Sequence, residues 1–438
     1  MAVQDSRELS GETARYFTRN LAVNVLVDFT QGLGLAMTAA GTIGAVFLHS
    51  LGASNAVVGA APGLGMAAYV ALQLPSVQLA QGLRAKKPIL VWGLVAAYLP
   101  WVPIALLTPV WARAQPGLMT VAFLGLFTLS WLLWGTASPA WGQLLPRLFP
   151  DRRRGFAMGV IVAASGAGGL VGGWYAGFVL SHYPYPQNFA RLFLTAALVM
   201  VAGRCLNLLS HETVPRQATR KRPKPLARVV AHIWHTDFRL RRFLAARYVF
   251  EAGGLVGVFF ALRTLDRFDL PVAWAGYFSL VLSLGSSAVA PLLGRLGDKR
   301  GYRRVMSWGM VIGAAASLLV MVAPTPALAL GVFLLAGAAN AADGVAYTNL
   351  LVEMSEEKRR GHYVALGFSA MAPMRLLAPI LWGLVADRVG LAWIFPCGLA
   401  LQLAGWGLLT TAVEEPRRPG RRVLHWQHGW LPLPRFFW

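Results

Sequence analysis

The sequence has few charged residues and few long polar stretches. Only 13% of its 438 residues are charged and 56% are hydrophobic, whereas soluble domains carry roughly 25% charged residues. An ordinary soluble globular protein is therefore excluded. Apolar segments, each long enough for a helix to cross a bilayer, follow one another along the chain. The residues between them are too few for a soluble catalytic domain.

Cysteine is also scarce. Cys205 and Cys397 lie in separate apolar segments, without a CxxC spacing or a histidine partner, so no redox or metal motif is indicated. His232 and His235 have a spacing that suits a metal, but a third ligand is missing. The sequence contains no Walker-type loop, which gives no support to direct drive by ATP. We therefore expect neither a cofactor nor a metal.

Acidic residues are few compared with basic ones. Lys and Arg number 40 against 18 Asp and Glu, which gives a formal net charge of +22. A nucleic-acid-binding protein would gather these cations on one solvated face. Here they stand in short runs between apolar stretches, so no nucleic-acid partner is expected.

The apolar runs predict twelve transmembrane helices and hence an all-α integral membrane protein. The fourth and tenth have polar centres where breaks could occur. Twelve spans place both termini on one side of the membrane. The predicted spans lie near 21–49, 56–80, 88–110, 118–143, 156–181, 191–210, 243–264, 272–292, 304–323, 327–352, 363–387 and 391–413.

The basic residues are divided unequally between alternate loops. With the N-terminus inside, the inner segments hold 33 of the 40 Lys and Arg, and the outer loops hold 5. Because positively charged loops remain in the cytoplasm, both termini are expected there, with anionic lipid as a partner of the inner face. The use of Arg over Lys, 34 to 6, favours a GC-rich prokaryote and a bacterial inner membrane.

A basic stretch broken by prolines divides the spans into two groups of six. Corresponding loops of the two groups resemble each other, because QGLRAKKPILVWG after the second span matches RLGDKRGYRRVMSWG after the eighth. Such internal repeats are typical of transporters. The expected parts are a cytoplasmic tail (1–20), a six-helix bundle (21–210), a linker with an amphipathic stretch (211–242), a second bundle (243–413) and a basic, aromatic tail (414–438).

The segment GRLGDKRGYRR, residues 294–304, resembles the loop signature G-x-L-x-D-x-x-G-x-R/K-R/K of the major facilitator superfamily. The resemblance implies two pseudo-symmetric six-helix bundles and a cytoplasmic latch that stabilises the outward-facing state. Asp298 would then meet the start of the eleventh span, near residues 359–361, or of the fifth. A loop with ordinary surface charges is the alternative. The matching residues are Gly294, Leu296, Asp298, Gly301, Arg303 and Arg304.

Ionisable groups inside a membrane cost roughly 2.5–3.5 kcal/mol each on insertion scales, so each requires a reason. In the first span Asn24, Asp28 and Gln31 share one helix face, and we expect this face to line an aqueous cavity. Asp28 could there carry the coupling proton. A structural hydrogen bond to a neighbouring helix is the alternative.

Other ionisable residues lie at similar depth in the second half. Glu251 holds nearly the position of Asp28, but a pair with Arg247 one turn earlier is a sufficient account of it. Asp343 and Arg375 are predicted to pair, and Arg375 is either structural or binds an anionic substrate. Arg204, near the inner end of the sixth span, is expected to extend its guanidinium to the interface.

Small residues repeat at four-residue intervals in three spans, which predicts helix surfaces that approach closely and slide. The run SGAGGLVGG in the fifth span also resembles the glycine-rich motif of family exporters, although it lacks the proline of that motif. These residues are Ser165, Gly169, Gly173 and Gly177, then Ser279, Ser283 and Ser287, and Gly59, Gly63 and Ala67.

The leading hypothesis is a secondary transporter that moves a small solute by alternating access as a monomer. Protons are the candidate coupling ion, and efflux is mildly favoured over uptake. The alternatives are a transporter-derived sensor or scaffold and a membrane-embedded enzyme. An enzyme would need a His/Asp or metal cluster at the interface, which the sequence lacks, so no enzymatic activity is expected.

Overall fold

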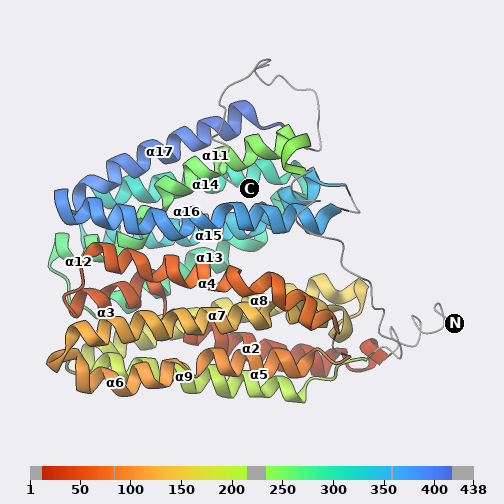
Figure 1. Ribbon diagram of the computed structural model, residues 1–438, viewed down its shortest axis with the longest axis horizontal. Helices are drawn as coiled ribbons and strands as arrows, with labels where there is room; N and C mark the ends of the chain where they lie inside the picture. Colours follow the sequence, from red (N-terminus) through yellow and green to blue (C-terminus); the bar gives the residue numbers. More distant parts are fainter. Residues whose placement is uncertain (1–11, 83, 215–232, 357–358, 417–438) are drawn as a thin grey trace.

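The computed structural model describes residues 12–82, 84–214, 233–356 and 359–416, and these residues form helices without strands (Figure 1). Most of the predicted N-terminal tail, the central part of the linker and most of the C-terminal tail lie outside the described residues. Twelve helical stretches among them are long and apolar enough to cross a membrane. Each overlaps one of the twelve predicted spans, so the predicted all-helical membrane fold is confirmed.

The first bundle contains the helices of the first six spans. In chain order these are α2 (Phe17–Met37), the π-helical turn η1 (Ala40–Gly44), α3 (Ala45–Ser50), α4 (Asn55–Gly82), α5 (Lys87–Tyr98), α6 (Trp101–Ala114), α7 (Pro116–Leu148), α8 (Asp151–His182), α9 (Gln187–Leu206) and the 3₁₀ turn η2 (Asn207–Leu209).

The second bundle contains the remaining six spans and lies above the first in Figure 1. Its helices are α11 (Phe238–Gly254), the 3₁₀ turn η3 (Leu255–Phe259), α12 (Phe260–Phe268), α13 (Trp274–Arg300), α14 (Tyr302–Val322), α15 (Pro326–Met354), α16 (Arg360–Val389) and α17 (Leu391–Ala412). We call the end of the molecule where α2 begins and α17 ends the terminal end, and the opposite end the distal end.

The breaks within spans are not where the sequence suggested. α7 and α15 run unbroken through their polar centres, whereas the first, third and seventh spans are interrupted at η1, at Pro100 and at η3. A polar residue of α7 forms a hydrogen bond with the neighbouring helix α5. The Ser130 hydroxyl donates over 2.6 Å to the Ala97 carbonyl, beside the break at Pro100. A polar group in mid-span thus satisfies backbone that another helix leaves exposed.

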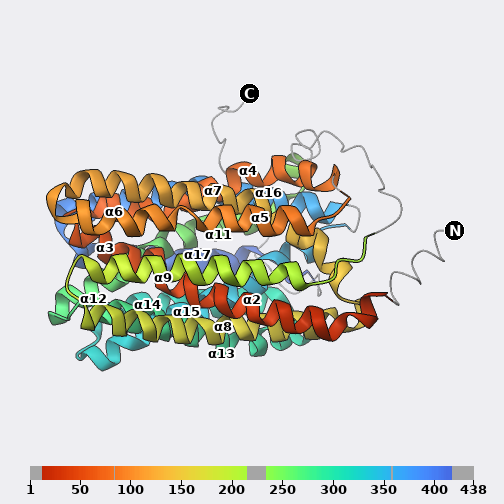
Figure 2. The ribbon, with the colours of Figure 1, turned by 90° about the horizontal axis from the view of Figure 1, so that it is seen from below.

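Two pairs of helices join the bundles. α8 lies beside α13 and α4 beside α16, as Figures 1 and 2 agree. Glycines permit backbone contact here: a Cβ on Gly173 would lie 2.4 Å from the Leu280 nitrogen, and one on Gly59 would lie 2.2 Å from the Pro379 oxygen. The predicted close-approach surfaces are confirmed at these positions.

The buried apolar residues form two clusters. One contains Phe47 and Phe123 of the first bundle together with Phe278 and Phe333 of the second, and the last two rings stack at 4.1 Å. The other cluster, around Phe243, is confined to the second bundle near its terminal end. The bundles therefore share a packed core at the distal end but not at the terminal end.

Candidate functional site

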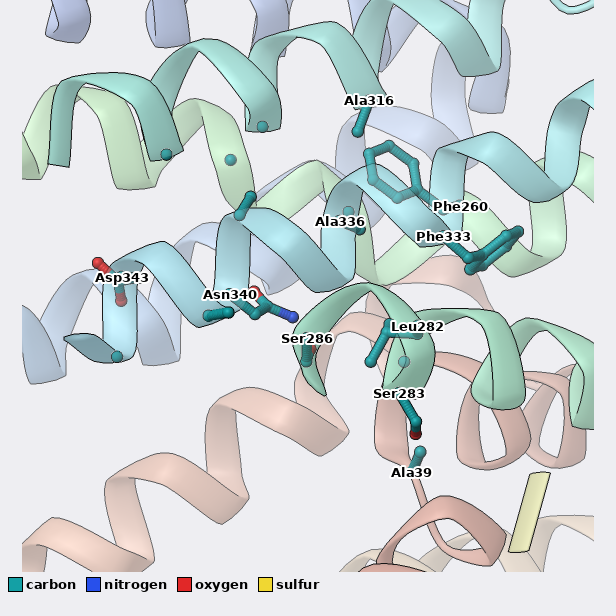
Figure 3. Close-up of a pocket in the computed structure, with 18 of the residues that line it drawn as sticks. Ala39, Phe260, Leu282, Ser283, Ser286, Ala316, Phe333, Ala336, Asn340 and Asp343 are labelled. Atoms are coloured by element: carbon teal, nitrogen blue, oxygen red, sulfur yellow. The ribbon is translucent and has the colours of Figure 1, made fainter. Parts of the chain in front are cut away.

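A cavity of about 1040 Å³ lies between the two bundles and is lined by helices of both (Figure 3). On the distal side it ends at Thr42, Phe260 and Phe333. There the Thr42 and Ser279 hydroxyls form a hydrogen bond of 2.5 Å between the bundles. Toward the terminal end α4 and α16 diverge (Figure 1). The cavity is therefore closed at the distal end.

Asp28 is the acidic residue that the first bundle contributes to this cavity, within the described residues. It also lines an adjoining pocket of about 250 Å³ inside the first bundle. Gln31 and Arg204 line this side pocket together with the aromatic residues Trp134 and Trp141. Asp28 therefore stands where an aromatic pocket meets the main cavity.

Arg204 does not extend to the interface, so that expectation was wrong. Only 5% of the residue is exposed. Its guanidinium donates hydrogen bonds to the Gln31 side-chain oxygen and, over 3.4 Å, to Asn207 Oδ1, and it acts electrostatically on Asp28. The cation is retained because Gln31 and Asn207 accept from it and Asp28 opposes its charge.

The predicted polar face of the first span is divided between three environments. Asp28 reaches the main cavity and Gln31 reaches only the side pocket. Asn24 lines neither and is fully buried, because its amide donates to the Asn20 carbonyl at 2.7 Å and its oxygen accepts from Asn207 at 3.4 Å. The expectation that Asn24 lines the cavity is corrected: the end of the sixth span packs over it.

Four charged residues of the second bundle form one ion cluster beside the cavity. The guanidinium of Arg247 lies 2.7 Å from both Glu251 and Asp343. Arg375 donates a hydrogen bond to Glu251 and lies 3.8 Å from Asp343. From the sequence we predicted two separate pairs, Arg247 with Glu251 and Asp343 with Arg375. In the structure α11, α15 and α16 bring all four residues together in a cluster with no net charge.

The ion cluster is unevenly shielded. The side chains of Arg247, Glu251 and Arg375 are 6%, 9% and 15% exposed, whereas the Asp343 side chain is 30% exposed. Arg247 also stands over the Tyr347 ring, 5.5 Å from its centroid. Asp343 is consequently the member that faces the cavity most openly, at one end of the labelled α15 residues in Figure 3.

Serine hydroxyls of α13, the helix packed beside α15, also line the cavity. Ser283 and Ser287 donate to the carbonyls of Ser279 and Ser283, at 2.9 and 2.8 Å, and Ser286 donates to Gly337 of α15 at 2.9 Å. Since these hydroxyl hydrogens are engaged, the oxygens are left to accept hydrogen bonds from a solute. No group of three or more potential metal ligands occurs within the described ranges.

The loop that resembles the family signature is mostly helical. α13 continues through Asp298 to Arg300, and the chain turns at Gly301, whose φ is 90°. Asp298 accepts a hydrogen bond of 2.7 Å from the Tyr302 hydroxyl at the start of α14. The implied contact with the start of α16 or α8 belongs to a state that is closed at the terminal end, so it stays a prediction.

The other signature residues have ordinary surroundings. Leu296 packs at the edge of the Phe243 cluster, Arg304 is exposed, and a Cβ on Gly294 would meet nothing within 4 Å. Arg303 donates to the Thr410 carbonyl at the end of α17, at 2.7 Å. The signature therefore ties the ninth span to the twelfth.

The first bundle has a matching connection that sequence reasoning missed. Glu212 accepts hydrogen bonds from the backbone of Lys86 and Lys87, at 2.8 and 2.9 Å, and from the Arg147 guanidinium at 2.6 Å. Burial lowers the pKa of the Lys86 ammonium and Arg147 lowers it further, while Glu212 partly offsets both effects. Glu212 thus caps the start of α5.

The two connections follow the internal repeat. Lys87 donates to the Ser210 carbonyl at 2.9 Å, after the sixth span, as Arg303 does to Thr410 in the twelfth. Adding 216, the offset between the Trp-Gly pairs at 92–93 and 308–309, to 87 gives 303. Glu212 could have been noticed in the sequence as an acidic residue directly after the sixth span.

The comparisons with known proteins agree with this architecture. The family model described as Major Facilitator Superfamily matches residues 26–379 and 252–433. The multidrug resistance protein MdtG of Klebsiella pneumoniae (strain 342) is 26% identical over 268 residues, which are 60% of this chain and 64% of that protein. The uncharacterized MFS-type transporter YuxJ of Bacillus subtilis (strain 168) is 28% identical over 138 residues, 31% of this chain and 34% of that protein. The chain thus spans less than two thirds of either relative.

Solved structures share the fold at low sequence identity. The nucleoside transporter NupG has a TM-score of 0.68 at 14% identity, over 89% of this chain and 98% of that chain. A D-xylose-proton symporter has a TM-score of 0.66 at 15% identity, over 92% and 99%. With twelve spans in two bundles, a cavity between them and a family model matching most of its length, the chain belongs to the Major Facilitator Superfamily.

Proposed function

We propose that the chain is a secondary active transporter that moves a small solute across the bacterial inner membrane by alternating access. The observation that carries this proposal is a charged cavity between two bundles that is closed at one end. A pore open at both ends would dissipate a gradient, whereas a cavity that opens to one side at a time can be coupled to one. One chain forms the entire cavity, which supports a functional monomer.

The terminal end is proposed to face the cytoplasm. The excess of Lys and Arg in the loops of this end supports the assignment, and the described conformation is then inward-facing, with anionic lipid against the basic loops. This orientation can be tested with single cysteines at two exposed positions, Arg300→Cys at the terminal end and Val389→Cys at the distal end. Each is introduced into a chain from which Cys205 and Cys397 have been removed. An impermeant thiol reagent added to intact cells should label only the second.

Efflux is the proposed direction. The relatives named as multidrug resistance proteins support it, and so does a resting cavity that would load from the cytoplasm. The acceptor oxygens of α13 and the carboxylates of Asp28 and Asp343 suit a solute that carries hydrogen-bond donors.

Asp28 is proposed to carry the coupling proton. Each carboxylate of the ion cluster lies beside two arginines, so protonating either would leave a buried net positive charge. Protonation of Asp28 also removes the charge that opposes Arg204, but it leaves one arginine rather than two to be stabilised, and Arg204 keeps its hydrogen bonds to Gln31 and Asn207. Among the cavity's acids, Asp28 can therefore change charge at the lowest cost.

Reconstitution tests both proposals. Purified protein in liposomes with an imposed pH gradient is given a panel of small antibiotics and amphipathic dyes, and their accumulation is measured. Asp28→Asn should abolish gradient-driven accumulation but preserve exchange, while Asp266→Asn, a change at an exposed position of α12, should behave as wild type. Accumulation at the normal rate by Asp28→Asn would refute the coupling role. Binding of panel compounds without any flux would instead favour a sensor.

A further inference from the structure

The distal end of α16 repeats the pattern found at the terminal end of α13. Residues 383–390 and 294–301 both read Gly-x-x-x-Asp-x-x-Gly. In each case the helix ends at the residue before the second glycine, which has φ 90° and ψ near 150°. The amide of that glycine donates to the carbonyl four residues earlier. The chain therefore builds the same turn, with an aspartate in the same place, at both ends of the molecule.

The distal aspartate is engaged with the other bundle. Asp387 Oδ1 accepts hydrogen bonds from the backbone and side-chain nitrogens of Asn55, at 2.8 and 2.9 Å, and Oδ2 accepts from the backbone of Ala56 at 3.1 Å. Asn55 begins α4. A carboxylate on the second bundle thus caps a helix of the first, where the partial positive charge of the helix end favours an anion.

The start of α4 depends on this contact for its hydrogen bonds. The next two backbone N–H groups, of Val57 and Val58, are satisfied locally by the Ser54 hydroxyl and carbonyl, at 3.4 and 3.0 Å. The first two are satisfied by Asp387. The Val58 bond is the first i→i−4 bond of the helix, so two of the three preceding N–H groups, which lack a partner in the helix, are here supplied from across the bundle interface.

Close backbone packing aligns the end of α16 with the start of α4. A Cβ on Gly383 would lie 2.3 Å from the Asn55 carbonyl oxygen. This approach places Asp387, one turn further along α16, directly over the start of α4. When the bundles separate at this end, the cap and the backbone contact must break together.

We infer that Asp387 is a positioning residue of the transport cycle, a distal latch that holds the cavity closed on its distal side through Asn55 and Ala56. The inference rests on the proposed alternating access. Opening the distal end breaks the hydrogen bonds of the exposed Asp387 carboxylate and leaves the N–H groups of Asn55 and Ala56 to water. The distal latch therefore favours the state in which the cavity loads from the terminal end.

The experiment measures conformation directly. Spin labels are placed at Leu118 and Trp393, exposed positions at the distal ends of α7 and α17, in a chain with Cys205→Ser and Cys397→Ser. Distance distributions are recorded by double electron–electron resonance in lipid nanodiscs, without solute or gradient. Asp387→Asn removes the charge and one acceptor oxygen. Loss of a helix cap typically costs about 1 kcal/mol, so the fraction of distal-open molecules should rise about fivefold.

Two further variants make the result specific. Asn55→Ala removes one of the three hydrogen bonds and should give a smaller shift in the same direction, and it keeps the test open if Asp387→Asn fails to fold. Asp266→Asn should leave the distances unchanged. Unchanged distributions in both latch variants would overturn the inference. The spin-label measurement does not depend on transport, so a shift in distance combined with no flux in the liposome assay would sustain the latch and reject the proposed function.

Discussion

Charge neutrality of the ion cluster can be tested by removing its most buried acid. Glu251→Gln keeps the size of the side chain but leaves two arginines with one carboxylate. Removing one partner of a buried ion pair typically destabilises a protein by 3–5 kcal/mol, because the remaining charge is uncompensated. We expect the variant to fold with an unfolding temperature lowered by roughly 3–6 °C, given the entropy of unfolding of a chain of this length, as measured from tryptophan fluorescence in detergent.

The distances within the cluster predict which second change restores stability. In Glu251→Gln with Arg375→Gln, Arg247 and Asp343 remain as a neutral pair at 2.7 Å. In Glu251→Gln with Arg247→Gln, the remaining pair is Arg375 and Asp343 at 3.8 Å. Both double variants are neutral, but the first retains the closer contact and should recover more of the lost stability.

Two outcomes would refute this reasoning. If Glu251→Gln unfolds at the wild-type temperature, the cluster is hydrated well enough that its net charge has no consequence. If the two double variants are equally stable, the distances do not govern the pairing. A change at an exposed acid, Glu356→Gln, serves as the control and should alter stability by less than about 0.5 kcal/mol.

Three further predictions follow from individual contacts. Gly383→Ala forces a Cβ against the Asn55 carbonyl and should increase the distal-open population in the spin-label measurement, whereas Gly142→Ala, where nothing lies within 4 Å, should not. Glu212→Gln weakens three hydrogen bonds at the start of α5 and should lower stability by roughly 1–3 kcal/mol, and an unchanged unfolding temperature would contradict its capping role. Asp298→Asn should favour the terminal-open state by roughly 1–3 kcal/mol if the latch loop engages α16 or α8 in the opposite state; normal flux and normal crosslinking across the distal mouth would reduce Asp298 to an ordinary loop residue.

The number of spans could be predicted because the bilayer selects for apolar length, which is written locally in the sequence. The helix breaks could not, because they depend on partners. Pro100 interrupts its span, whereas Pro139 lies within the continuous α7. At the break, the Ser130 hydroxyl of a neighbouring helix donates a hydrogen bond to the Ala97 carbonyl. Periodicity along one segment does not contain that information.

In the candidate site, too, local spacing could be predicted from the sequence but contacts between helices could not. Helical spacing placed Arg247 beside Glu251, and similar depth placed Asp343 near Arg375, but the merging of the pairs depends on how α11 is rotated toward α15 and α16. Asn24 was assigned to the cavity because it shares a helix face with Asp28. The end of the sixth span buries Asn24, and this contact depends on tertiary packing that helical spacing does not reveal. Asp387 was missed although its sequence pattern repeats that of Asp298, since the repeat occurs on the opposite side of the membrane.

The division of the apolar core has a consequence for biogenesis. The first bundle's buried aromatic cluster includes Phe278 and Phe333, which are synthesised more than 80 residues after Phe189 of the same cluster. During insertion, the distal wall of the first six spans is therefore incomplete until α13 and α15 enter the bilayer, and acyl chains must cover it in the meantime. The terminal end of the second bundle assembles around Phe243 without help from the first. The two halves, alike in sequence pattern, are thus unequal as folding units.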